Sequence, residues 1–303
     1  MEPFLYSMII AATPFLFAGM GELVAERSGV LNLGVEGMML MGAVVAFATA
    51  YSTGSTPLAI LAGAGAGAAV ALIFCIVSLS LLANQAATGL ALTIFGIGAS
   101  GLIGQGFVGE ALTPLQPLSV PYLSDQTAVG RVLLNHDPLV YMALIIAGGV
   151  AWFLSRTRAG LSLRAVGDNH ESAHALGLHV IRIRYLATLF GGAMAGLGGA
   201  YLSLVYTPMW GENMTAGRGW IALALVVFAT WRPFRLVAGA YLFALVTQLQ
   251  FYGQDWGVPV ASQFLAMAPY IATIVALVII SRDVRLTKAN APACIGQAFR
   301  AER

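Results

Sequence analysis

Long apolar runs alternate with short polar intervals along this chain. A helix needs about 20 apolar residues to cross a bilayer, so the runs predict an all-α, polytopic membrane protein. We expect about nine transmembrane helices in a single transmembrane domain that covers residues 1–303. The runs lie at about 4–20, 30–51, 57–82, 86–108, 139–154, 185–206, 220–230, 236–251 and 264–280.

Small residues repeat within two of these runs at the spacing that favours close helix contact. Gly63 and Gly67 lie four residues apart in the third run, and Gly192 and Gly196 do so in the sixth. Such pairs let two helix backbones approach each other inside a membrane. We therefore expect both runs to pack tightly against neighbouring helices.

The longest polar interval follows the fifth run and covers residues 156–184. Its middle predicts a short helix, because Gly167-Asp168-Asn169 provides turn and cap chemistry and Gly177 provides a stop. Helix-forming residues fill the space between, from Glu171 to Leu176. We interpret residues 155–184 as a cytoplasmic loop that docks a partner in water.

Basic residues set the expected orientation. They cluster at 156–184, at 232–235 and in the tail at 282–303, and two spans separate each cluster from the next. All three clusters therefore fall on one side of the membrane, which the positive-inside rule assigns to the cytoplasm. This predicts a multi-pass protein with its N-terminus outside and its C-terminus, as a cytoplasmic tail, inside.

The second run begins with a polar, glycine-rich segment, SGVLNLGVEGM at residues 28–38. Asn32 and Glu36 are expected to share a helix face because they lie one turn apart. A carboxylate at membrane depth is costly and must face protein or water. Two interpretations stay open: a broken span whose polar end lines a translocation path, or an inter-helix hydrogen bond that fixes packing.

Composition agrees with lipid as the main solvent. Hydrophobic residues make up 59% of the chain and charged residues 9%, against roughly 25% charged residues in soluble domains. The net charge of +2 gives no sign of a nucleic-acid partner. Cys75 and Cys294 supply no disulfide framework and are expected to be reduced. No basic residue precedes the first apolar run, which argues against a cleaved signal peptide.

The sequence shows no catalytic motif, so we do not expect an enzyme. HExxH, GxSxG and Walker lysine motifs are absent. His170 and His174 have the i, i+4 spacing of metal ligands, but no cysteine lies nearby and His179 lies beyond the stop at Gly177. A solvated helix face is the favoured interpretation, and no metal site is expected.

Three motifs, in order, resemble the permeases of the ribose/nucleoside (simple sugar and nucleoside) branch of the bacterial ABC importers. They are GVLNLGVEGMMLMGA at 29–43, AVGDNHESAHALGLHV at 165–180 and NMTAGRGWIALALVVFATWRP at 213–233. The first is similar to the nucleoside-type variant of the family's segment. The resemblance implies a permease subunit of an ATP-driven importer in the bacterial cytoplasmic (inner) membrane, moving nucleosides into the cytoplasm. Alternatives are an importer of ribose or another simple sugar, an ion-coupled secondary transporter, and a structural membrane subunit without transport.

The resemblance also implies partners and residue roles. The partners are an ABC ATPase subunit that uses ATP-Mg, a second and non-identical permease, and a periplasmic or lipoprotein solute-binding protein. This chain itself would bind no cofactor. The coupling helix would contact the ATPase through Gly167, Asp168, Asn169, Glu171, Ala173, Leu176 and Gly177. A weakly polar translocation path is expected along Asn32, Glu36, Gln85, Thr88 and Thr93.

Overall fold

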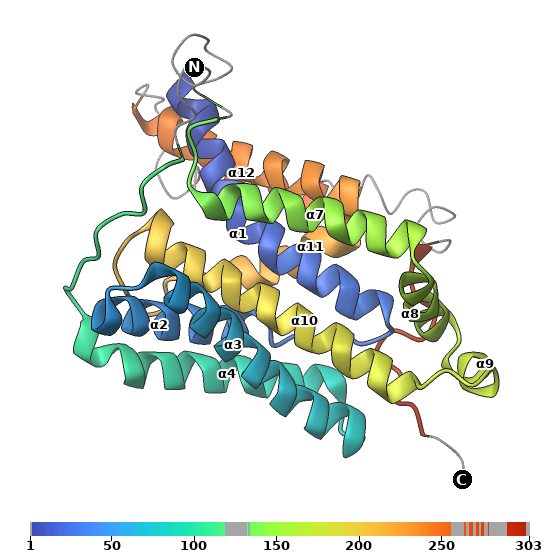
Figure 1. Cartoon of the computed structure of the whole chain (residues 1–303). Helices are drawn as coiled ribbons and strands as arrows, with labels where there is room; N and C mark the ends of the chain where they lie inside the picture. Colours follow the sequence, from blue (N-terminus) through green and yellow to red (C-terminus); the bar gives the residue numbers. More distant parts are fainter. Residues whose placement is uncertain are drawn as a thin grey trace.

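The computed structural model describes residues 2–118, 134–255 and 290–300, with position 132 and single positions between 264 and 278 (Figure 1). Every regular element in this part of the chain is helical. Seven helices are long and apolar enough to cross a membrane, and three further helices are shorter. The long helices are α1 (Glu2–Arg27), α2 (Val35–Thr53), α3 (Thr56–Cys75), α4 (Gln85–Gly104), α7 (Pro138–Arg156), α10 (Val180–Tyr201) and α12 (Pro233–Asp255). The shorter ones are α8 (Arg158–Asp168), α9 (His170–Ala175) and α11 (Arg218–Phe228).

Local sequence signals mark several helix ends. Asn84 caps α4, because its Oδ1 accepts a hydrogen bond of 2.9 Å from the backbone N–H of Ala87. Asp137 caps α7 in the same way through the N–H of Leu139, at 2.9 Å, and Pro138 follows at the first helical position. Gly54 ends α2 in the left-handed conformation that glycine adopts without strain.

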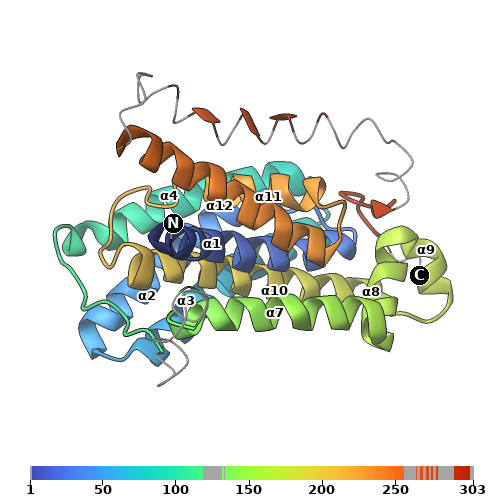
Figure 2. The ribbon, with the colours of Figure 1, turned by 90° about the horizontal axis from the view of Figure 1, so that it is seen from above.

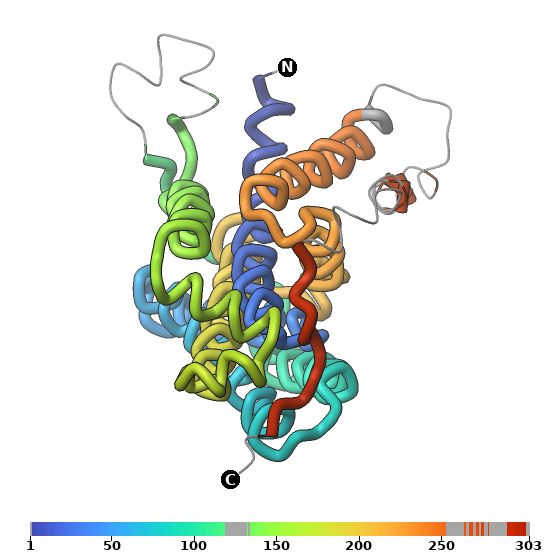
Figure 3. The backbone as a smooth tube through the Cα atoms, turned by 90° about the vertical axis from the view of Figure 1, so that its right-hand side faces the viewer, coloured from blue at the N-terminus to red at the C-terminus, as the bar shows by residue number. Residues whose placement is uncertain are grey.

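Helix α1 is the centre of the bundle. Its membrane-length window is 89% buried, whereas that of α4 is 28% buried. It packs against α10, α12, α11 and α7 (Figures 1 and 3). The central position explains why nearly all of its buried residues are apolar or small, with Glu22 and Glu26 as the acidic exceptions.

The two predicted close-packing glycine pairs meet each other, so this prediction is confirmed. A Cβ atom on Gly67 of α3 would overlap the carbonyl oxygen of Gly192 on α10. A Cβ atom on Gly196 would overlap the carbonyl oxygen of Gly63. The absence of side chains at these four positions lets α3 and α10 touch backbone to backbone.

The first run is expected to end at about residue 20, but α1 continues to Arg27, so residues 21–27 are helical. Both acidic residues of this stretch, Glu22 and Glu26, are 1% exposed inside the bundle. Trp231, which follows α11, donates its indole N–H to Glu26 Oε2 at 2.5 Å. Carboxylates that face protein rather than lipid are compatible with a membrane helix.

The count of nine spans stays a prediction. Residues 220–228 lie in α11, whose 11 residues extend about 16 Å, less than a hydrocarbon core of about 30 Å, so the helix alone does not confirm a span there. The ninth run, 264–280, lies largely outside the described residues, as does much of the proline-rich interval before α7. Seven candidate spans are therefore what the structure supports.

Candidate functional site

A non-helical stretch at residues 28–34 separates α1 from α2 and enters the bundle. It lies beside the start of α4, where Gln85 Oε1 accepts a 2.9 Å hydrogen bond from the backbone N–H of Leu31. A Cβ atom on Gly89 of α4 would lie 2.6 Å from the nitrogen of Leu33. The second span is thus broken at its start, and the break is stabilised by α4.

Asn32 belongs to this stretch and not to a helix. Its Oδ1 accepts a 2.9 Å hydrogen bond from the N–H of Gly34, the residue that precedes α2. The expectation that Asn32 and Glu36 share a helix face is therefore wrong, because α2 begins only at Val35. Asn32 is buried and shapes the turn into α2.

Two threonines of α4 lie on the buried side of that helix. Thr93 Oγ1 donates to the carbonyl oxygen of Leu33 at 3.1 Å, so it also holds the broken stretch. Thr88 Oγ1 donates to the carbonyl oxygen of Asn84 in its own helix at 2.8 Å. Phe95, by contrast, is exposed on the outer face of α4.

Glu36 accepts hydrogen bonds across the bundle from the beginning of α11. Its Oε1 accepts from Thr215 Oγ1 at 2.5 Å and from the N–H of Gly217 at 2.8 Å, and its Oε2 accepts from the N–H of Gly219 at 2.6 Å. The first N–H groups of a helix lack partners within the helix, and the helix dipole favours an anion there. Glu36 therefore caps α11 from another helix and is only 3% exposed.

The structure brings four of the five expected path residues to one place. Asn32, Gln85 and Thr93 contact or form the broken stretch, and Glu36 lies at the α2 end of it. Thr88 lies one turn beyond Gln85 on the same buried side of α4. In this chain alone all five side chains are buried, and their role in a path stays a prediction.

A short helix, α9, stands in the middle of the polar interval, as the sequence predicts. Asn169 caps it through a 2.9 Å hydrogen bond from the N–H of Ser172 to Oδ1. Gly177 follows with a φ of +84°, which glycine tolerates best. Glu171 and Gly177 are exposed, and Leu176 is 82% exposed. Helices α8 and α9 together lie at one end of the bundle (Figure 2).

Two of the residues expected to contact an ATPase face inward instead. Ala173 is buried in a small cluster with Val166, Val180 and Phe299. Gly167 lies so close to α1 that a Cβ atom there would overlap the carbonyl oxygen of Arg27. Asp168 is the exposed last residue of α8. The Ala173 side chain and the close approach of Gly167 to α1 hold this region against the bundle, while the exposed residues of α9 face away from it.

Arg184 is the buried cation of this region. It lies in α10 and is 1% exposed, although the sequence places it at the edge of the polar interval. Its Nε donates to the carbonyl oxygen of Ser28 at 3.2 Å, and its Nη1 donates to that of Gln297 at 2.9 Å. Its Nη2 lies 3.1 Å from Nδ1 of His170. One guanidinium thus connects α10 with the broken stretch, α9 and the tail.

The described part of the tail packs on the bundle, which sequence reasoning missed. The N–H of Cys294 donates to Gly167 at 2.9 Å, and the N–H of Gly296 donates to Gly29 at 3.1 Å. The Phe299 ring lies edge-on to His170 at 5.2 Å between centroids. The apolar residues Cys294, Ile295 and Phe299, set among polar neighbours, are the signal that could have indicated a docked tail.

The histidine pair does not form one solvated face. His170 is buried, whereas His174 is exposed. Burial, and then the nearby Arg184 cation, lower the pKa of His170 from its ordinary value. Within the described ranges, no group of three His, Cys, Asp or Glu residues could hold a metal ion.

Comparison with known proteins places the chain among membrane permeases. A family model described as "Branched-chain amino acid transport system / permease component" matches residues 4–280. The chain is 39% identical to a putative glucose ABC transporter permease protein of Haloferax volcanii, over 98% of this chain and 97% of the relative. It is 33% identical to a nucleoside ABC transporter permease protein of Lactococcus lactis subsp. cremoris, over 96% and 94%. It is 29% identical to a guanosine ABC transporter permease protein of Bacillus subtilis, over 89% of each. No solved structure matches it.

Proposed function

Since the chain belongs to the permease-component family that matches residues 4–280, we propose that it forms one half of the pore of an ATP-driven importer. A separate ATPase subunit would hydrolyse ATP-Mg, and an external solute-binding protein would deliver the solute. A second, non-identical permease would complete the pore, as the nucleoside-type resemblance implies. The chain would be an inner-membrane subunit without catalytic activity of its own.

The observation that carries this proposal is the position of α9. The helix lies between two membrane-length helices, α7 and α10, at the end of the bundle. Leu176, beyond the membrane-spanning helices, is 82% exposed and available to a protein partner. A capped, water-facing helix with one open apolar residue fits an ATPase surface better than it fits a structural membrane subunit.

We propose nucleosides as the solute, with a purine nucleoside favoured. The support is that two of the three relatives are named for nucleoside or guanosine transport and match most of this chain. A simple sugar is the second candidate, because the relative with 39% identity is named for glucose. Uptake of radiolabelled guanosine by cells carrying the complete system decides between them. Guanosine uptake that excess glucose does not reduce supports the first, and glucose or ribose uptake that nucleosides do not reduce replaces it with the second.

The proposed docking role of α9 has its own test at Gly177. A bulky side chain meets open space there, but a φ of +84° is strained for any residue with a branched Cβ. Gly177→Val should therefore distort the end of α9 and uncouple ATP hydrolysis from uptake, while the protein still inserts. Normal uptake by this variant would show that the loop is not the coupling element.

The proposed orientation places the Asn213 loop outside and α9 inside. Cys75 and Cys294 are both buried, so we expect the native cysteines to add little to the labelling of a single introduced cysteine. Asn213→Cys should react with a membrane-impermeant thiol reagent added to whole cells, and His179→Cys should react only after lysis. The reverse pattern would invert the orientation without affecting the family assignment.

The proposed path residues are Asn32, Glu36, Gln85, Thr88 and Thr93. Their polar groups are occupied by protein partners in this conformation. We therefore propose that Gln85 and Thr93 meet solute only when the stretch at 28–34 moves relative to α4, and that Glu36 does so only when it leaves the start of α11. Discontinuous helices with polar breaks near the solute route are typical of transport proteins.

A further inference from the structure

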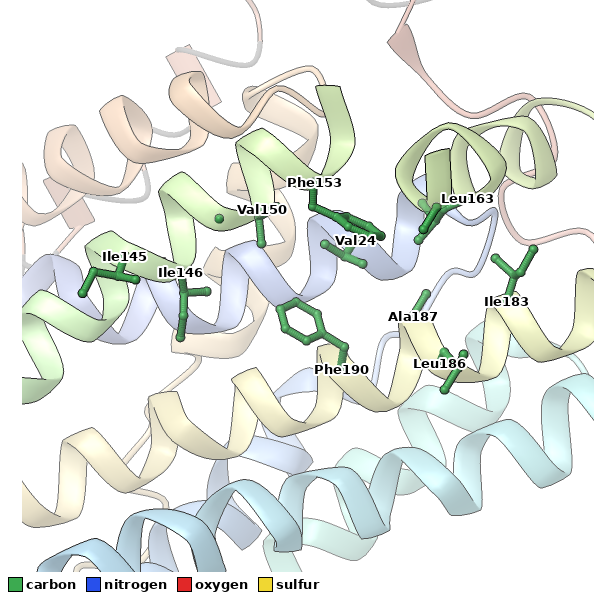
Figure 4. A pocket seen from close by; sticks show the side chains of 12 residues that line it. Val24, Ile145, Ile146, Val150, Phe153, Leu163, Ile183, Leu186, Ala187 and Phe190 are labelled. Atoms are coloured by element: carbon green, nitrogen blue, oxygen red, sulfur yellow. The ribbon is translucent and has the colours of Figure 1, made fainter. Parts of the chain in front are cut away.

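An apolar hollow of about 560 Å³ opens between α1, α7, α8 and α10 (Figure 4). None of its 12 lining residues has a polar side chain. Figure 4 shows Phe153 and Leu163 on one side of it and Phe190 and Leu186 on the other. The hollow exists because α7 and α10 diverge toward the end of the bundle where α8 and α9 lie, and α8 crosses between them there.

The hollow is open toward the membrane. Ile145 of α7 is 73% exposed and Leu186 of α10 is 60% exposed, and both line it. Both helices are membrane-length spans, so these side chains lie at hydrocarbon depth. An apolar space of this kind offers water no hydrogen-bond partners and is suited to a hydrocarbon chain.

Three arginines stand next to lining residues of the hollow, at the end of the bundle where α8 and α9 lie. Arg156 follows the lining residue Phe153 by one helical turn, Arg158 is adjacent to lining residue Ala159, and Arg182 precedes the lining residue Leu186 by one turn. All three arginines are exposed.

Within the described ranges, these charges have no ion-pair partner. Neither α7 nor α10 contains an acidic residue, and the acidic residue of α8 is its last, Asp168. No ion pair or hydrogen bond to the three guanidinium groups occurs among the described residues. As far as the structure describes the chain, the apolar hollow is therefore flanked by positive charge without an ion-pair partner.

We propose that the hollow binds an anionic phospholipid. One acyl chain would lie in the apolar slot between α7 and α10, and the phosphate would lie on Arg156, Arg158 and Arg182. Basic pockets between membrane helices bind anionic headgroups in this manner. Charge complementarity at the mouth favours a phospholipid over a segment of a second protein chain, which would need acidic residues at this level. The proposal does not depend on which solute is transported.

The test measures lipid retained by the full-length chain, alone and with any subunit that co-purifies. Native mass spectrometry after exchange into phosphatidylglycerol or phosphatidylcholine gives the number of bound lipids. Gly149→Leu would fill the hollow, because Gly149 lines the hollow and an added Cβ atom there meets open space. Gly148→Leu is the matched control: its Cβ also meets open space, but Gly148 does not line the slot.

We expect retained phosphatidylglycerol to fall about tenfold in Gly149→Leu and to stay unchanged in Gly148→Leu. Each Arg→Gln change at 156, 158 or 182 should weaken phosphatidylglycerol retention about fivefold, and Arg232→Gln should not. Equal retention of both lipids, or normal retention by Gly149→Leu, would overturn the proposal. So would loss of a co-purifying subunit from Gly149→Leu with lipid retention unchanged, because the slot would then be a protein contact.

Discussion

Nη2 of Arg184 lies 3.1 Å from Nδ1 of His170, and this contact joins α10 to α9. A guanidinium can only donate, so Nδ1 must accept and His170 must be neutral, with its proton on Nε2. The same guanidinium donates to Ser28 in the broken stretch and to Gln297 in the tail. Movement of α9 is thus connected through one side chain to the stretch that precedes α2.

Arg184→Met is expected to destabilise the protein. The change removes the donor of the buried Ser28 carbonyl oxygen and one donor of the partly buried Gln297 carbonyl oxygen. A buried acceptor left unpaired costs about 1–3 kcal/mol. The apparent unfolding temperature in detergent, measured by scanning fluorimetry, should fall clearly. Arg232→Met is the control, because Arg232 is exposed and its side chain has no hydrogen bond among the described residues. Equal unfolding temperatures for wild type and Arg184→Met would contradict the role given to this residue.

Stability is expected to depend on pH through His170. Burial first, and the Arg184 cation second, lower the pKa of this histidine from its ordinary 6.5, and Glu171 opposes them. The unfolded chain therefore takes up the proton at higher pH than the folded chain, so the free energy of unfolding falls as pH drops below 6.5. Above that value the contribution is fully present.

His170→Asn isolates this effect, because the amide oxygen can accept from Arg184 without titrating. The unfolding temperature of this variant should decline less between pH 7 and pH 5 than that of wild type. The comparison is needed because burial also lowers the pKa of His136, with the same sign. His174→Asn, at an exposed position, should follow the wild-type curve. Parallel curves for wild type and His170→Asn would exclude His170 as the source.

The sequence was sufficient for features that depend on neighbours along the chain. Apolar length predicted the seven long helices, and Asn169 with Gly177 predicted the bounds of α9 to within a residue or two. The spacing of Gly63 and Gly67 predicted a close helix contact, although not that α10 would be the partner. Each of these signals is complete within a few turns of chain.

Features that depend on distant residues were not predictable. Glu26, in the membrane-length helix α1, accepts a hydrogen bond from Trp231, which lies 205 positions later in the chain. The partners of Glu36 lie 179 to 183 positions away, at the start of α11. The spacing of Asn32 and Glu36 predicted a helix at Asn32. The hydrogen bonds with Gln85 and Thr93 that hold this stretch in a non-helical conformation come from α4 and cannot be read from the local sequence.

A side chain at Gly67 is expected to prevent proper packing of α3 on α10. Its Cβ would overlap the Gly192 carbonyl oxygen, and backbone atoms cannot move aside as the end of a side chain can. Gly67→Leu should therefore give little monodisperse protein by fluorescence-detected size exclusion. Gly65→Leu adds the same side chain two positions earlier, where the Cβ meets open space, and should behave as wild type. Comparable yields of the two variants would show that α3 and α10 do not touch as described.

Glu36→Gln is expected to weaken both folding and transport. The carboxylate accepts from Thr215, Gly217 and Gly219 through its two oxygens. Glutamine keeps one acceptor oxygen but places an NH2 group against at least one of these donors. The mismatch leaves a buried donor unpaired and costs about 1–3 kcal/mol.

Two measurements on Glu36→Gln separate the interpretations that the sequence leaves open. If Glu36 mainly caps α11, the unfolding temperature and the solute uptake should fall together, and Thr215→Val should lower both to a smaller extent. If Glu36 instead meets solute, uptake should fall while the unfolding temperature stays that of wild type. We expect the first result, because all three hydrogen bonds tie the carboxylate to the first turn of α11 and its approach. An unchanged unfolding temperature would show that capping by Glu36 contributes little to stability, and it would favour a role of Glu36 in the translocation path.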